Sequence, residues 1–239
     1  MDKISTAIPE HFSKEKKKRY LDACKRYNDC TCRKINNKHR GIYKAIRKHP
    51  SKNLLDVGCG DGYFACFLAK LGYNVTGIDL SKESLSVAKS LAKTVGVDKV
   101  NFSYINAHEL WRGSYDAAYC FDVVEHILWE EQGSFLESIY NRLKPKGAFF
   151  VRAPHAFNIR QYIPGHIGLP TYEQFMGLAT EVGFTPKVII GHSGIASIIN
   201  YAIPYEKAVD MLFSSSSYWR YTFMKYLSLA NVVVKLEKK

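Results

Sequence analysis

The sequence predicts an α/β fold with a mostly parallel sheet and helices on both of its faces. Short apolar runs alternate with longer helical patterns between residues 53 and 152. Strands separated by single helices pair in parallel through right-handed crossovers. With 239 residues, of which 46% are hydrophobic and 23% charged, the chain has the size and composition of a globular protein with a full core.

Residues 1–50 are expected to form a helical N-terminal cap that includes a basic arm. Apolar side chains recur at helical spacing in two places, around Tyr20 to Cys24 and around Ile42 to Ile46. Pro50 marks the boundary with a core of residues 51–239, because proline disfavours the helical conformation in the residue before it.

The core begins with a strand, a glycine-rich turn and a helix. The apolar run Leu54 to Val57 has the length of a buried strand. Gly58, Gly60 and Gly62 follow, before a helical pattern that stops at Gly72. Glycine has no Cβ and tolerates positive φ, so this turn lets a ligand touch bare backbone.

Two carboxylates near this turn indicate the kind of ligand. A dinucleotide-binding turn needs glycine where this chain has Tyr63, and Asp56 would repel a pyrophosphate but suit a cation. The next strand, from Val75 to Ile78, ends at Asp79, which is placed to accept hydrogen bonds from both ribose hydroxyls. The pattern indicates a phosphate-free nucleoside with a positively charged part, a description that S-adenosylmethionine meets.

The motif D-x-G-C-G-x-G, followed by an apolar strand that ends in aspartate, closely resembles the class I S-adenosylmethionine-dependent methyltransferases. The resemblance implies a Rossmann-like, seven-stranded, mostly parallel sheet with an antiparallel last hairpin. It also implies that the cofactor is held by Asp56, Gly58, Cys59, Gly60, Gly62, Asp79, Leu80, Asn106, Ala107, Phe121 and Asp122. Many members have aspartate at the position of Asn106, whose amide oxygen can still accept from the adenine amino group.

The next elements continue the alternation of strands and helices. Ser81 is a predicted N-cap for a helix that stops at Gly96. Strands are expected over residues 100–105, 115–121 and 148–152, with a helix around residues 135–143 before the last of them.

The C-terminal part of the chain has a looser pattern. Residues 154–170 hold two histidines and three prolines and are a candidate substrate loop. Thr171 and Gln174 form a capping box for a helix that stops at Gly183. The last two strands are expected at Val188 to Ile190 and at Ala230 to Leu236, with an insertion over residues 195–228.

Methylation of a hydroxyl is helped by a general base, whereas an amine acceptor need only be neutral. The candidates for the base are Asp122, Glu125, His126, His155 and His166. Glu125 and His126 follow the fourth strand in D-V-V-E-H, where they can instead orient the next helix. His155 follows the fifth strand, and His166 lies where many relatives also carry histidine.

The composition sets further expectations. Six cysteines without a secretion signal indicate reduced thiols, and their spacing lacks the paired C-x2-C of a zinc site, so no metal is expected. No apolar run approaches the ~18–20 residues that cross a bilayer. A cytoplasmic protein is therefore expected.

The predicted function is methylation of a hydroxyl, or an amine, on a small molecule such as a sugar or another metabolite. The net charge of +12 leaves an RNA methyltransferase open, with the basic arm on phosphates. The aromatic stretch from Tyr218 to Leu227 leaves open a membrane-surface or lipid-linked substrate. The non-enzyme alternative is a binding module that keeps the cofactor fold. The oligomeric state stays open.

Overall fold

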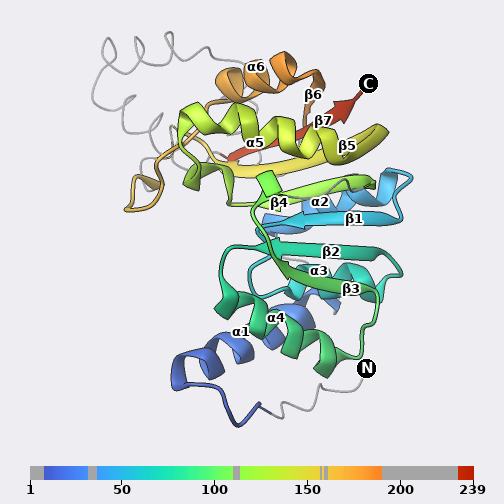
Figure 1. The fold of residues 1–239 in the computed structure, drawn as a ribbon, viewed down its shortest axis with the longest axis vertical. Helices are drawn as coiled ribbons and strands as arrows, with labels where there is room; N and C mark the ends of the chain where they lie inside the picture. The colour runs from blue at the N-terminus through green and yellow to red at the C-terminus, as the bar shows by residue number, and fades with distance from the viewer. Residues whose placement is uncertain (1–7, 32–36, 110–113, 157, 159–160, 190–230) are drawn as a thin grey trace.

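A seven-stranded sheet forms the centre of the computed structural model, which describes residues 8–31, 37–109, 114–156, 158, 161–189 and 231–239 (Figure 1). The strand order is β3-β2-β1-β4-β5-β7-β6. β7 is antiparallel to both of its neighbours, and the other pairs are parallel. The strands are β1 (Asn53–Val57), β2 (Asn74–Asp79), β3 (Val100–Tyr104), β4 (Tyr115–Phe121), β5 (Leu143–Pro154), β6 (Phe184–Val188) and β7 (Asn231–Lys238). The predicted sheet is thus confirmed, including its antiparallel end.

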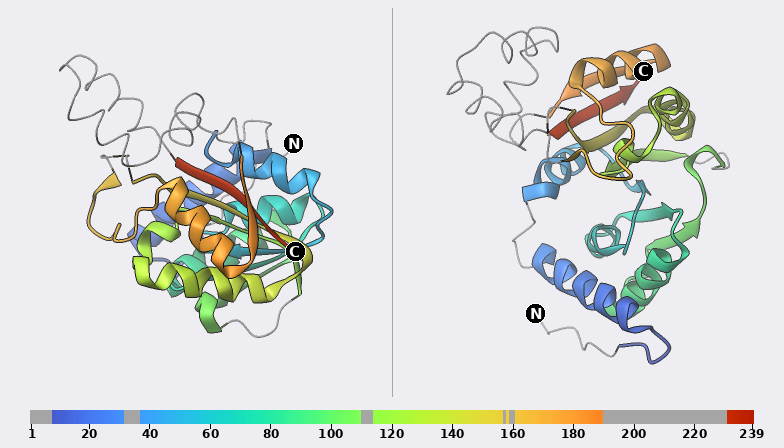
Figure 2. Two further views of the ribbon diagram at one scale, coloured as in Figure 1. Left: turned by 90° about the horizontal axis from the view of Figure 1, so that it is seen from above. Right: turned by 90° about the vertical axis from the view of Figure 1, so that its left-hand side faces the viewer.

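Helices cover both faces of this sheet (Figure 2). They are α1 (Lys14–Thr31), α2 (Asn37–Lys48), α3 (Tyr63–Lys70), α4 (Lys82–Val95), α5 (Trp129–Arg142) and α6 (Tyr172–Val182), with short 3-10 helices η1 (Ala107–Glu109) and η2 (Val124–His126). Side chains of α1 to α4 pack with one face of the sheet, and those of α5 and α6 pack with the other. Adjacent strand residues such as Leu54 and Leu55 belong to opposite clusters, because successive side chains of a strand point to opposite faces.

The local signals at the helix ends are confirmed. The Ser81 hydroxyl accepts a hydrogen bond from the Ser84 amide at 3.1 Å, and Gly96 ends α4 in the left-handed conformation. Thr171 and Gln174 form the predicted capping box of α6. These ends depend on contacts within a few residues, which is why the sequence reveals them.

The predicted position of the sixth strand is wrong. β6 covers Phe184–Val188 instead of residues 188–190, and it contains Pro186. Proline is tolerated there because β6 is the edge strand and pairs only with β7. An edge strand needs fewer backbone N–H donors for hydrogen bonds to neighbouring strands.

The two N-terminal helices share the core of the sheet. Tyr20, Cys24, Ile42 and Ile46 are buried in one cluster with α3 and α4, and the Tyr20 hydroxyl lies 2.6 Å from that of Thr94 on α4. No helix in the described ranges is both long enough and apolar enough to span a membrane. The predicted insertion over residues 195–228, with its aromatic stretch, lies outside the described residues.

Candidate functional site

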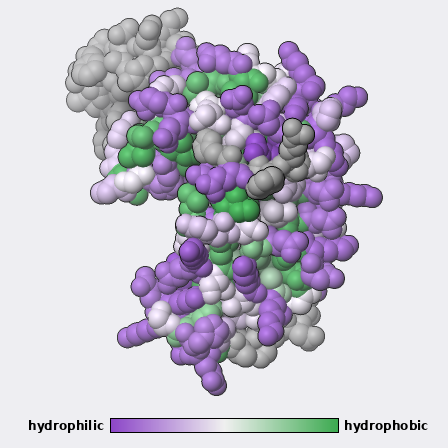
Figure 3. All heavy atoms as spheres, in the orientation of Figure 1, coloured by the Kyte–Doolittle hydropathy of each residue, from purple (hydrophilic) through white to green (hydrophobic). Residues whose placement is uncertain are grey.

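The carboxyl ends of the first four strands meet at one side of the molecule, which Figure 3 shows hollowed between its upper and lower parts. A cleft of about 640 Å³ lies here, a size typical of small-molecule sites. Its lining comes from the ends of β1, β2 and β3, from the segment after β4, and from α5. Predicted cofactor residues in this lining are Gly58, Asp79, Leu80, Asn106, Ala107 and Asp122.

The glycine turn has the backbone conformation that the sequence predicts. Gly58, Gly60 and Gly62 have φ values of 70°, 52° and 72°, a region that other residues rarely adopt. A Cβ on Gly62 would lie 2.6 Å from Cβ of Ala88. A Cβ on Gly60 would meet nothing within 4 Å, and Gly60 lines a second cavity. Gly62 is therefore required by packing, whereas Gly60 exposes backbone to open space.

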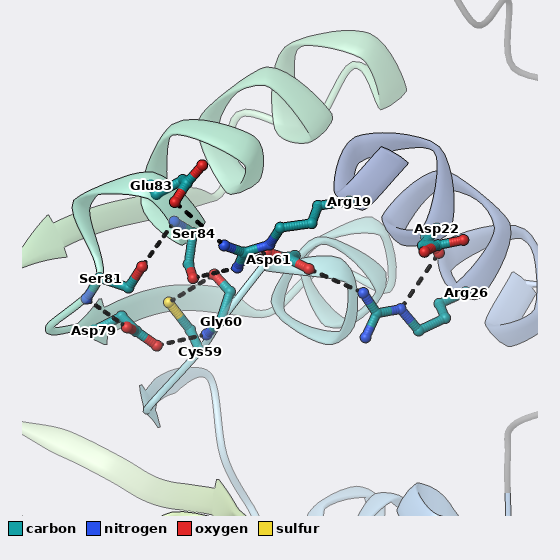
Figure 4. Close-up of polar contacts among 10 residues, drawn as sticks. All are labelled: Arg19, Asp22, Arg26, Cys59, Gly60, Asp61, Asp79, Ser81, Glu83 and Ser84. Atoms are coloured by element: carbon teal, nitrogen blue, oxygen red, sulfur yellow. Dashed lines mark hydrogen bonds and ion pairs between the residues drawn. The ribbon is translucent and has the colours of Figure 1, made fainter. Parts of the chain in front are cut away.

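Three amide donors at the start of this turn are already engaged. The amides of Gly58 and Cys59 donate to the Ile78 carbonyl at 2.9 and 3.0 Å. The Gly60 amide donates to Oδ2 of Asp79 at 2.8 Å (Figure 4). Phosphate recognition by a glycine-rich turn needs free amide donors. This arrangement therefore favours a ligand without phosphate.

Asp79 joins the glycine turn to the start of α4. Its Oδ1 accepts from the Ser81 amide at 2.8 Å, while Oδ2 holds the Gly60 amide (Figure 4). A carboxylate has about four lone-pair sites, so Asp79, which lines the cleft, keeps capacity for a ribose hydroxyl. Leu80, the next residue, is 62% exposed and offers an apolar surface for the base of a nucleoside.

The second cavity, of about 200 Å³, also borders the turn and shares Gly58 and Asp122 with the larger cleft. Its lining includes the predicted residues Asp56, Cys59, Gly60 and Phe121. Burial raises the pKa of Asp56 to about 8, because the charged carboxylate loses its hydration. A cationic ligand group would stabilise the ionised form of this carboxylate.

Asp122 occupies the junction of the two cavities and is strained. Its φ is 55°, an unusual value for a residue other than glycine and one found at functional sites. Its carboxylate is paired with Arg152, which also bonds Oδ1 of Asn231 at 3.0 Å. The carboxylate is thus held in a fixed orientation by a cation of β5.

His126 and His166, two of the candidate bases, lie side by side. Their ring centroids are 4.8 Å apart, and His126 lines the larger cleft. Nδ1 of His126 lies 2.8 Å from the Gly165 carbonyl, and Nδ1 of His166 lies 2.8 Å from the Gln161 carbonyl. A carbonyl only accepts, so each neutral ring carries its proton on Nδ1 and its lone pair on Nε2.

Glu125 joins these two histidines in a cluster that could hold a metal ion. Ligand atoms of Glu125, His126 and His166 all lie within 4.8 Å of one another, and Glu125 is fully buried. Metal-binding histidines typically donate their second ring N–H to a carbonyl or carboxylate, as both rings do here. From the sequence, no metal is expected. Within the described part of the chain, Glu125, His126 and His166 are the residues that could bind a metal ion.

His155, another candidate base, lines neither of these two cavities. It is buried, packs against Tyr172 with ring centroids 5.7 Å apart, and is not among the described residues that line either cavity. Burial lowers its pKa to about 4. The structure thus places His126 and His166 together, while His155 lines neither of these two cavities.

Six lining residues of the smaller cavity do not appear among the predicted site residues, and three of these six come from the two N-terminal helices. Arg19 and Arg26 of α1 and His39 of α2 line it together with Asp56. From the sequence alone, these arginines are interpreted as part of a basic arm. The two arginines are spaced by about two helical turns, which places both on one side of α1. This spacing could have indicated a shared partner, but no nearby residue in the sequence identifies which residue that partner is.

The residues of the two cavities fit S-adenosylmethionine. The larger cleft offers a carboxylate, an amide and apolar surface for the nucleoside, from Asp79, Asn106 and Leu80. The smaller cavity offers carboxylates and guanidinium groups for a zwitterionic amino-acid part. The bare backbone at Gly60 leaves the room that such a group needs.

Comparison with known proteins agrees with this geometry. Residues 55–151 match the family model described as "Methyltransferase domain". A ubiquinone biosynthesis O-methyltransferase of Shewanella pealeana is 34% identical over 54% of this chain and 55% of its own length. Its counterpart in Ralstonia nicotianae is 29% identical over 69% of this chain and 76% of its own length. The chain spans about half the length, or less, of the first curated relatives it matches.

Solved structures share the fold. The YcgJ protein of Bacillus subtilis superposes with a TM-score of 0.63 over 84% of this chain and 99% of its own, at 19% identity. Phosphoethanolamine N-methyltransferase 2 of Haemonchus contortus, in complex with S-adenosyl-L-methionine, gives 0.57 over 83% of this chain and 51% of its own, at 20% identity. With a methyltransferase-domain match over residues 55–151 and a seven-stranded sheet of this order, the chain is similar to the class I S-adenosylmethionine-dependent methyltransferases.

Proposed function

We propose that this protein transfers the methyl group of S-adenosylmethionine to a hydroxyl of a small molecule. One observation carries the proposal: the 640 Å³ cleft and the 200 Å³ cavity meet at Gly58 and Asp122, and His126 lines the larger one. The proposed nucleoside site, the proposed amino-acid site and the candidate general base are thus next to one another. The relatives that match this chain are named as O-methyltransferases, which favours a hydroxyl over an amine.

In this proposal Asp79, Leu80, Asn106 and Ala107 bind the nucleoside of the cofactor. Asp56, Gly58, Cys59, Gly60, Gly62, Phe121 and Asp122 surround its amino-acid part. The bound cofactor supplies an electrophilic methyl group on a sulfonium. The chain's contribution is to fix the acceptor in line with that group, since placement alone can lower such a barrier by several kcal/mol, roughly 7–11 in well-oriented systems.

His126 is the proposed general base, and His166 is its neighbour. Nδ1 of His126 is fixed on the Gly165 carbonyl, so the proton of the acceptor hydroxyl would pass to Nε2. The ring of His166 lies against that of His126 and holds it in orientation. Asp122 has a positioning role, because its carboxylate is paired with Arg152.

Apolar side chains near the two histidines favour an acceptor with an apolar part over a bare sugar. Leu128, Tyr162, Ile163 and Ile167 are 45%, 65%, 49% and 56% exposed. They belong to the segments that carry His126 and His166. Exposed apolar groups gathered beside a cleft mark a surface for an apolar partner.

The proposal is tested by following formation of S-adenosylhomocysteine with a panel of acceptors. The panel contains a hydroxylated aromatic ring with an alkyl tail, the same ring without the tail, a free sugar, an aromatic amine and a short RNA. Turnover is expected with the hydroxylated rings, faster with the tail, and lost in His126→Asn with S-adenosylhomocysteine affinity unchanged. Turnover of the RNA alone, with binding that weakens steeply in salt, would contradict the proposal.

A further inference from the structure

Two ion pairs join the neighbouring strands β4 and β5 at their opposite ends (Figure 1). At the amino end, Nζ of Lys144 lies 2.6 Å from Oδ1 of Asp116. At the carboxyl end, the guanidinium of Arg152 is paired with the carboxylate of Asp122. Asp122 lines both the larger cleft and the smaller cavity. The same kind of contact therefore occurs twice on one pair of strands, once at the candidate site and once at the far end.

Arg152 holds Asp122 through the backbone as well as through the side chain. The Asp122 amide donates to the Arg152 carbonyl at 2.9 Å, and the guanidinium uses Nη1 for the Asp122 carboxylate. The other terminal nitrogen, Nη2, donates to Oδ1 of Asn231, the first residue of β7, at 3.0 Å. The Arg152 side chain is only 12% exposed. Its guanidinium is thus fixed between the end of β4 and the start of β7.

These two contacts matter because the backbone of Asp122 is strained. Its φ of 55° lies in the left-handed region, which residues with a Cβ rarely adopt. Such a conformation persists only where the surrounding structure holds the residue in place. Arg152 provides this hold from β5, the strand beside β4, and Asn231 in turn fixes the second arm of the guanidinium.

The bend at Asp122 directs the next residues of the chain onto the glycine turn. Val123 follows, and its Cγ2 lies 2.4 Å from the place that a Cβ on Gly58 would take. Val123 therefore packs directly on the bare backbone of Gly58. The short helix η2 comes next and ends at His126, whose amide donates to the Val123 carbonyl at 3.0 Å. The conformation of Asp122 thus sets where His126 lies relative to the glycine turn.

We propose that Arg152 is a positioning residue for methyl transfer: it holds Asp122 in the left-handed conformation and thereby places His126 at the acceptor hydroxyl. Arg152 is not among the described residues that line the two cavities, so it acts through Asp122 and not on the reactants. The inference rests on the proposed function, since it takes His126 as the base.

The first test measures kcat and cofactor affinity separately in Arg152→Met, with the tailed hydroxylated ring as acceptor. The substitution removes the guanidinium and keeps an unbranched side chain in β5. We expect kcat to fall about 10- to 100-fold, because a base misplaced by about 1 Å can cost about 100-fold in rate. The affinity for S-adenosylhomocysteine, measured by calorimetric titration, should fall much less than kcat.

The matched control is Lys144→Met, which removes the ion pair at the amino end of the same two strands. It lowers the free energy of unfolding without reaching the site, so its kcat should equal that of the wild type. A merely structural role of Arg152 would make the two variants behave alike at a temperature where both are folded.

The second test uses glycine, which adopts positive φ without a partner. In an Asp122→Gly background, Arg152→Met should lower kcat by far less than it does in the wild type, as a double-mutant cycle measures. Arg152→Lys keeps the charge but lacks the fork of donors, so it should recover part of kcat. If Arg152→Met does not fold, Arg152→Lys takes its place, with a smaller loss that Asp122→Gly again removes.

Wild-type kcat in the Arg152 variants would overturn the assignment and leave the proposed function standing. So would an equal fall of kcat and cofactor affinity in Arg152→Met, or a loss of kcat that is the same with and without Asp122→Gly. A wild-type protein that does not methylate the hydroxylated ring would overturn both the assignment and the proposed function.

Discussion

Replacing Gly60 or Gly62 by alanine separates two roles of the glycine turn. Both residues have positive φ, which costs a residue with a Cβ about 1–2 kcal/mol. Alanine returns about 0.4–1 kcal/mol by restricting the unfolded chain. Gly60→Ala adds no contact within 4 Å, so its net loss of unfolding free energy should be about 1 kcal/mol.

Gly62→Ala adds a packing cost to the same backbone cost. The new Cβ would lie 2.6 Å from Cβ of Ala88 and 2.7 Å from Cζ of Phe102. Overpacking of this kind costs about 1–3 kcal/mol more. The total, about 2–4 kcal/mol, is a large share of the stability of a typical domain, about 5–15 kcal/mol.

Urea unfolding, followed by circular dichroism, measures the two losses under one condition. Calorimetric titration with S-adenosylhomocysteine then measures binding by the folded variants. Gly60→Ala should stay folded and bind weakly, because its methyl group enters the smaller cavity. Equal destabilisation by the two substitutions, or normal ligand binding by Gly60→Ala, would refute this reading of the turn.

Three further predictions concern titratable groups. His166→Asn should lower turnover less than His126→Asn, since only His126 lines the larger cleft; equal turnover by both variants in the acceptor assay would count against His126 as the base. Burial raises the pKa of Asp56 to about 8, so the native state holds this proton more tightly than the unfolded state does, and the free energy of unfolding should fall as pH rises from about 4 to 8. In Asp56→Asn, the free energy of unfolding measured with urea should depend less on pH in that window. An unchanged pH dependence would refute this reasoning. Burial lowers the pKa of His155 to about 4, so its contribution to the free energy of unfolding is present above about pH 6.5 and lost as pH falls toward 4. His155→Gln should remove this loss of stability at acid pH. If the stability of the variant declines as that of the wild type does, other groups cause the decline.

Much of the candidate cofactor site follows from local sequence. Positive φ at Gly58, Gly60 and Gly62 needs only the absence of a Cβ, and the placement of Asp79 needs only the end of a strand. Parallel strands bring their carboxyl ends to one edge, so the convergence of Asp79 and Asn106 was predictable. The residues that line the larger cleft agree with it.

The catalytic candidates were less predictable, because local sequence does not say which loop folds against which. His126 and His166 are brought together by the segment after β5, whose Gly165 carbonyl lies 2.8 Å from Nδ1 of His126. His155 carries the same chemical group and follows a strand end, yet it is buried against Tyr172 and lines neither of the two cavities.

By itself, the sequence determined the alternation of strands and helices, the helix caps and the kind of nucleoside, because each depends on neighbours along the chain. The tertiary structure decided that α1 contacts the glycine turn through Arg19, Arg26 and Asp61. Those arginines lie 42 and 35 residues from the aspartate along the chain. The sequence of a basic segment is the same whether its side chains face water or a buried carboxylate. Only the packing of α1 on α3 and α4 determines which charges meet.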